Sequence, residues 1–138
     1  MAIQAQYPDL IRGYDLVGEE DQGHTLLFHS QSLIQGFNDA FNGSNGTFNF
    51  YFHAAETNWP NDVLPSVLGD DSSTLDNVYD SLVFQTHRIG HGLGFFKHPK
   101  LYPYLIERGI AIEVCPTSNQ ILGIFYFLKT IKICNQVA

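Results

Sequence analysis

The sequence predicts an α/β fold with about four parallel βα units. Short apolar segments alternate with amphipathic ones along the 138 residues, and this alternation is typical of parallel sheets with crossover helices. Polar residues follow several of the predicted strands, and barrel enzymes carry their sites at such strand ends. A closed (β/α)8 TIM barrel takes about 250 residues, so four units correspond to a partial barrel of about half that size.

The first half of the chain contains two predicted strands and one predicted helix. A short strand within 10–18 runs into the acidic loop 19–21. Apolar residues recur near helical spacing over 25–41, which predicts a helix that ends at an Asn/Gly-rich loop. The aromatic segment 48–54 predicts the second strand.

The clearest predicted helix covers 73–86. Its apolar residues fall at i, i+3, i+4, i+7 and i+8, which predicts an apolar stripe lying on the sheet. The stripe consists of Leu75, Val78, Tyr79, Leu82 and Val83. Ser72, Ser73 and Thr74 are candidate N-caps, and Asp76 suits the positive end of the helix dipole.

Two further strands and a helix follow. Segment 88–92 predicts a very short strand and loop, and 110–115 predicts a fourth strand ending at Pro116. The helix between them covers 99–108, with Pro99 in its first turn and Gly109 at its stop. Pro103 removes a backbone donor there, so we expect a weakened or kinked helix.

The charge pattern narrows the class of protein. The net charge is −7, and residues 1–80 carry twelve acids against a single base. This acidic half, without any Lys/Arg cluster, argues against nucleic-acid binding.

The apolar run 121–128 is too short to span a bilayer, so we expect no membrane span. The residues after Met1 contain neither a basic flank nor an apolar stretch, so we expect no signal peptide in this chain.

Two sequons and two cysteines bear on the compartment. Asn42 and Asn45 begin consecutive N-x-S/T sequons in the Asn/Gly-rich segment, which makes both candidates for glycosylation in a secreted parent protein. Cys115 and Cys134 could form a disulfide, but the apolar strand pattern around Cys115 favours a buried thiol.

The residues that point to chemistry are His53, Glu56 and His91. His53 and Glu56 end one predicted strand, and His91 lies between two glycines after another. Imidazole is a common zinc ligand, and a nearby carboxyl and a second His suit proton transfer to and from a metal-activated water. A lone His at a strand end is more often structural, so the case rests on Glu56 lying three residues further on.

Four strand-end motifs together resemble the adenosine deaminases, and most of all the secreted adenosine-deaminase-related growth factors. The motifs are Asp15–Glu19, Phe52–Trp59, Thr86–Gly92 and Ile112–Gln120. Each is unspecific alone, but their order and spacing agree with the family. The resemblance identifies residues 1–122 as a partial adenosine deaminase barrel, roughly strands 4 to 7, and 123–138 as a divergent hydrophobic C-terminal tail.

The resemblance implies a zinc-dependent hydrolase that converts adenosine or 2′-deoxyadenosine to inosine or 2′-deoxyinosine and ammonia. It makes His53 a zinc ligand and Glu56 the proton donor to purine N1. His91 would orient and deprotonate the zinc-bound water. Gly18 would contact the purine through its backbone, and Trp59 would belong to the pocket wall.

Two parts of the family pattern are missing. The chain has no His-x-His pair, and its Asp70-Asp71 pair lies before a helix instead of at a last strand. Zn²⁺ would therefore find one ligand, His53, where catalytic sites generally use three or more protein ligands. We expect a truncated chain with little or no turnover, which assembles with a second copy or with a missing barrel half.

Two alternatives stay open. One is a non-catalytic extracellular protein that binds purines or acts like a growth factor. The other is a relative of AMP deaminase, although the sequons and the sequence of residues 56–59 favour the adenosine deaminases.

Overall fold

The computed structural model describes residues 3, 6–7, 9–43, 49–57 and 73–121. Within this part the strands are β1 (Gly13–Tyr14), β2 (Asn49–Phe50), β3 (His53–Ala54), β4 (Arg88–His91) and β5 (Ala111–Glu113). The α-helices are α2 (Ser30–Gly43), α3 (Asn77–Val83), α4 (Tyr102–Glu107) and α5 (Pro116–Ile121). Four 3₁₀ turns join them: η1 (Glu20–Gln22), η2 (Thr74–Asp76), η3 (Leu93–Lys97) and η4 (Pro99–Leu101).

Every strand pairing is parallel. β1 pairs with β2, and β3, β4 and β5 form a second sheet in that order. Backbone hydrogen bonds from Tyr51 to Tyr14 and from Gly90 to Phe52 bridge the gap between β2 and β3, so 49–54 acts as one strand. The predicted α/β class with parallel strands is confirmed. No closed barrel forms among the described residues, whose strands have an open parallel arrangement. The prediction of a partial barrel is therefore not confirmed.

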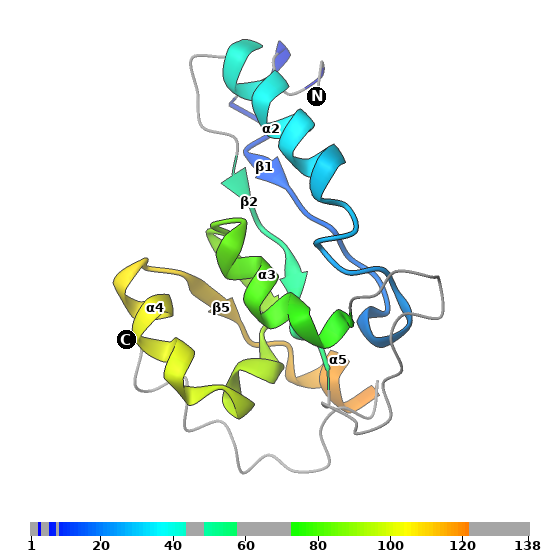
Figure 1. Cartoon of the computed structure of the whole chain (residues 1–138), viewed down its shortest axis with the longest axis vertical. Coiled ribbons are helices and arrows are strands. Elements are labelled where there is room, and N and C mark those ends of the chain that lie inside the picture. Colours follow the sequence, from blue (N-terminus) through cyan, green and yellow to red (C-terminus); the bar gives the residue numbers. More distant parts are fainter. Residues whose placement is uncertain (1–2, 4–5, 8, 44–48, 58–72, 122–138) are drawn as a thin grey trace.

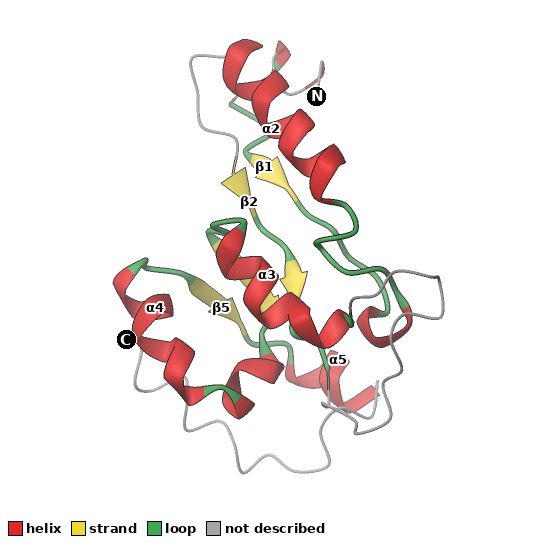
Figure 2. Ribbon diagram, viewed as in Figure 1, coloured by secondary structure: helices red, strands yellow, loops and turns green. Residues whose placement is uncertain are grey.

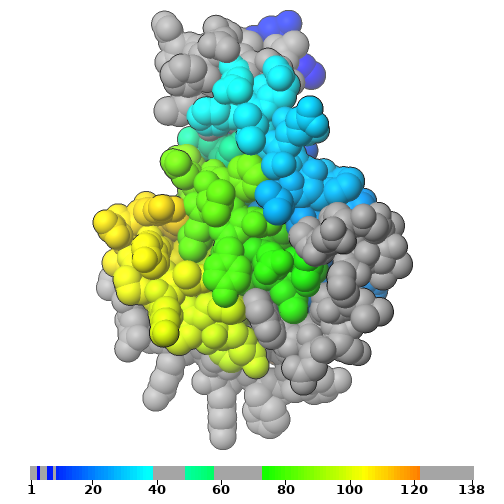
Figure 3. Space-filling view, in the orientation of Figure 1, coloured from blue at the N-terminus to red at the C-terminus, as the bar shows by residue number. Residues whose placement is uncertain are grey.

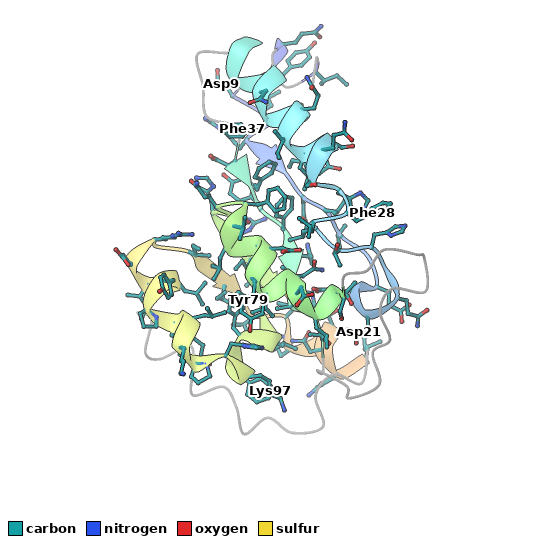
Figure 4. All side chains as sticks on the ribbon, in the orientation of Figure 1. Asp9, Asp21, Phe28, Phe37, Tyr79 and Lys97 are labelled. Carbon is teal, nitrogen blue, oxygen red and sulfur yellow. The ribbon has the colours of Figure 1, made fainter. Side chains whose placement is uncertain are left out.

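The helices lie over one face of the strands (Figures 1 and 2). Alternation along 50–54 directs Phe50, Phe52 and Ala54 into a core that also contains Ile89. Val78 and Leu82 of α3 and Leu33 of α2 pack against them, and the ring of Phe37 lies 6.1 Å from that of Phe50 (Figure 4). The space-filling view shows α2, α3 and α4 covering this side (Figure 3).

The opposite face of the strands is polar. The Arg88 guanidinium lies 4.9 Å from the Tyr51 ring centre and pairs with Glu113 at 3.1 Å. The Asn49 amide donates to the Tyr51 hydroxyl, and His53 pairs with Asp15 on the same side.

Several predicted elements differ in extent. β1 covers only two residues of 10–18, and α2 begins at Ser30 because the Thr25 hydroxyl accepts from the Phe28 N–H and stabilises a turn there. The stripe predicted for 73–86 is only partly buried: Val78 and Leu82 face the core, whereas Tyr79 and Val83 are 43% and 73% exposed. Buried Asn77 and Ser81 take the space beside the core instead.

Ser73 is the N-cap of the helical segment that starts at η2, and it forms a capping box with Asp76. The helix predicted over 99–108 is divided into η4 and α4, and Pro103 lies in the first turn of α4, where no backbone donor is needed. Gly109 has a positive φ of 63° just after α4, as its predicted role at the helix stop requires.

Candidate functional site

The carboxyl ends of β3 and β4 bring three predicted site residues together. His53 and Gly90 are register partners, as are Ala54 and His91. The rings of His53 and His91 lie 5.4 Å apart, and His91 Nδ1 lies 3.1 Å from Glu56 Oε1. Glu56 and His91 are buried, with 8% and 6% of their surfaces exposed.

Asp15, just after β1, fixes His53 from the neighbouring strand. Its Oδ1 accepts from the His53 backbone N–H at 2.9 Å, and its Oδ2 lies 2.8 Å from His53 Nδ1. A carboxylate only accepts, so Nδ1 carries a proton and Nε2 of the neutral ring keeps its lone pair. Histidines that bind metals commonly have such a carboxylate partner.

Gly90 leaves room for the His53 ring. A Cβ on Gly90 would lie 2.9 Å from ring atoms of His53, closer than real contacts allow. A glycine at this position therefore lets the imidazole lie flat across β4.

Asn119 of α5 fixes His91. Its Oδ1 lies 2.6 Å from His91 Nδ1, and the side chain is fully buried. Because an amide oxygen only accepts, Nδ1 of the neutral ring carries the proton and Nε2 is available as a base. His91 and Gly92 both have left-handed backbone, with φ of 65° and 62°, so the strand ends in a sharp turn under this ring.

Glu20 of η1 lies beneath the turn that carries Glu56. Its Oε1 accepts from the Ala55 N–H at 2.8 Å and from the Asn77 amide at 2.9 Å, and its Oε2 accepts from the Glu56 N–H at 2.6 Å. Burial raises the pKa of Glu20 from 4.5 to about 7, although these hydrogen bonds favour the ionised form.

Of the other predicted site residues, those in the described part of the chain lie outside this cluster. Gly18 is exposed in the loop after β1, with open space around the position of a Cβ. Asn42 lies near the end of α2 instead of in a loop. Trp59, Asn45, Asp70-Asp71 and Cys134 lie outside the described residues, and Cys115 is a free, half-buried thiol.

Sequence reasoning missed the partners of the three central residues. They are Asp15, Glu20 and Asn119, and Asn77 in turn binds Glu20. Asp15 and Asn119 belong to the quoted motifs, and this membership is the signal that could have singled them out.

The described residues do not complete a zinc site. His53 has the partner and the free nitrogen of a ligand, but no group of three or more His, Cys, Asp or Glu side chains in the described part of the chain could hold a metal ion. This part of the chain also contains no helix long and apolar enough to cross a membrane.

Comparisons with known proteins agree with the motifs. Residues 2–131 match the family model described as "Adenosine deaminase". The chain is 39% identical over 120 residues to an adenosine deaminase of Lutzomyia longipalpis, covering 87% of this chain and 20% of that protein. It is 33% identical over 139 residues to adenosine deaminase 2 of Homo sapiens, covering 100% of this chain and 24% of that protein.

The chain thus spans about a fifth to a quarter of the length of these curated relatives. The family match nevertheless extends over nearly the whole chain and includes every residue of the cluster around His53, Glu56 and His91. The chain belongs to the adenosine deaminase family.

Proposed function

We propose that this chain carries the acid/base part of an adenosine deaminase that converts adenosine or 2′-deoxyadenosine to the inosine product and ammonia. The observation that supports the proposal most is the pairing of buried Glu56 with buried His91 at the ends of adjacent parallel strands. In a member of this family, that pair supplies an acid and a base within one small site.

The proposed chemistry needs one proton delivered and one removed. The protonated Glu56 carboxyl gives its proton to purine N1, which makes C6 more electrophilic. His91 takes a proton at Nε2 from the water whose oxygen bonds to C6. His91 then gives this proton to the amino group, the C6–N bond breaks and ammonia leaves, and the new C6 hydroxyl returns a proton to the Glu56 carboxylate. Gly18 and Trp59 are proposed to contact the purine.

Zinc is the metal that the family leads us to expect, and His53 is its proposed ligand in this chain. The described residues do not complete the ligand set, so no step is assigned to the metal. We propose that the remaining ligands come from other parts of a longer protein, and that this chain alone turns over little or no nucleoside.

Inosine release tests the proposed roles. The chain is incubated with adenosine, with and without zinc, and compared with Glu56→Gln and with Glu107→Gln, an exposed control in α4. We expect only trace turnover, lost in Glu56→Gln and unchanged in Glu107→Gln. Robust deamination that survives Glu56→Gln would show that another group is the acid.

We also propose an extracellular parent protein, with Asn42 or Asn45 carrying a glycan. The first sequon begins in the last turn of α2, and the second follows it directly in the sequence. Expression in a secreting eukaryotic cell tests this proposal. A mass loss on enzymatic deglycosylation, absent in the Asn42→Gln/Asn45→Gln variant, is the expected result, and secreted but unglycosylated protein would contradict the glycan assignment.

A further inference from the structure

Glu20 holds two consecutive backbone N–H groups with one carboxylate. The N–H of Ala55 donates to one oxygen at 2.8 Å, and the N–H of Glu56 donates to the other at 2.6 Å. The Asn77 amide of α3 makes a third contact with this carboxylate. Glu20 is 35 residues away from Ala55 in sequence, so the contact ties the loop after β1 to the end of β3.

The turn that Glu20 holds is unfavourable by itself. Ala55 has φ of 59°, in the left-handed region, where the Cβ of an L-residue crowds the following carbonyl oxygen. Ala55 is fully buried, and a Cβ on Gly94 would lie only 3.1 Å from the Ala55 methyl group, so its neighbours leave little freedom for another conformation. Strained backbone of this kind persists where the surrounding structure holds it in place.

The turn decides where Glu56 points. A regular continuation of β3 would place Glu56 on the face of Phe52 and Ala54, which the helices cover. The left-handed residue ends this alternation, and the Glu56 carboxyl lies instead 3.1 Å from His91 Nδ1.

We propose that Glu20 is a positioning residue, which sets the place of the Glu56 carboxyl beside His91 by holding the left-handed turn at Ala55. The proposal rests on the proposed role of Glu56 as the acid. Its neighbour Glu19 differs, because Glu19 is exposed and accepts from Gln22 within its own loop.

Nuclear magnetic resonance of the full chain tests the proposal through two signals. Amide exchange at Ala55 and Glu56 reports the contact with Glu20, and the ring ¹⁵N signal of His91 reports the position of Glu56. The variants are Glu20→Gln, the matched control Glu19→Gln, and Glu20→Gln combined with Ala55→Gly. Glycine adopts the left-handed region freely, so a glycine at position 55 no longer needs the Glu20 contacts that hold the turn.

In Glu20→Gln we expect exchange at both amides to rise about tenfold or more, because the two N–H groups then share a single acceptor oxygen, and the His91 signal to move. Ala55→Gly in that background should return the His91 signal while exchange stays fast. Glu19→Gln should change neither. A role in fold stability alone would not produce rescue by glycine.

An unchanged His91 signal in folded Glu20→Gln would overturn the proposal, as would failure of the glycine rescue. If Glu20→Gln does not fold, Glu20→Asp takes its place, because it keeps the charge and shortens the reach by one methylene. The same two signals then decide. Neither signal depends on nucleoside or turnover, so a negative inosine assay and a failure of this proposal are distinguishable.

Discussion

At the scale of single residues, two site positions carry backbone that L-residues rarely adopt. Ala55 and His91 have φ of 59° and 65°. Each is held by a polar partner: Glu20 binds the turn at Ala55, and buried Asn119 binds the ring of His91. Strain of this kind clusters at functional sites, where it fixes the direction of reacting groups.

Glu20 predicts a pH dependence of stability. Its pKa is raised from 4.5 to about 7, so the folded state binds a proton more tightly than the unfolded chain does. Its contribution to stability is full below about 4.5 and is lost as pH rises through about 7. Between pH 5 and pH 8 the loss is about 2–3 kcal/mol. Urea unfolding at pH 5 and pH 8 should show this loss in the native chain and not in Glu20→Gln.

Glu19→Gln is the matched control for this experiment, because Glu19 lies exposed in the same acidic loop. It should keep the pH dependence of the native chain. Parallel stability curves for the native chain and Glu20→Gln would contradict a raised pKa at Glu20.

The sequence predicts site residues whose chemistry is characteristic, but not their partners. His53, Glu56 and His91 are recognisable because an imidazole or carboxyl at a strand end is uncommon. Their partners are ordinary polar residues, 28 to 38 positions away in the chain. Only the parallel register makes them neighbours, and a single sequence does not specify it.

At the scale of elements, periodicity predicts where the helices are better than which side they bury. The 73–86 stripe places Tyr79 beside Val78, yet Tyr79 faces out and its hydroxyl lies 3.0 Å from His98 Nδ1 (Figure 4). The core side of α3 includes Asn77, because its Oδ1 accepts from the Leu26 N–H. A hydrophobic pattern does not predict that a polar side chain is buried when its hydrogen-bond partner is distant in sequence.

Ser73, a candidate N-cap in the sequence, caps the 74–83 helical segment, and its substitution tests this role. Ser73→Ala should reduce the free energy of unfolding by about 1 kcal/mol, since it removes the capping box with Asp76. Ser32→Ala, on the exposed surface of α2, is the control and should change stability by less than about 0.5 kcal/mol. Equal effects in urea unfolding would contradict the cap.

Gly90 predicts a packing effect at β4. In Gly90→Ala the new methyl would meet the His53 ring at 2.9 Å, so the ring or the strand must move. We expect a loss of about 1–3 kcal/mol in stability and a shift of the His53 ring signals. Gly18→Ala has open space and should do neither. An unshifted His53 ring in Gly90→Ala would contradict the close contact.

At the scale of the whole molecule, α2, α3 and α4 cover one face of the strands (Figure 2). The other face is polar and carries Tyr51, Arg88 and Glu113. β1 and β5 are edge strands in the described part of the chain. Unpaired parallel edges promote association, so we expect a dimer or larger species in analytical ultracentrifugation. A monomer with one sharp two-state unfolding transition would contradict this expectation.

Nucleoside binding tests the central claim, that Glu56 and His91 form the acid/base pair of a purine site. The chain is titrated with purine riboside, which lacks the amino group that deamination removes, while histidine ring and backbone signals are followed. We predict saturable shifts at His53, Glu56 and His91, and none at exposed His87. Shifts confined to other residues, or none up to millimolar nucleoside, would contradict the claim.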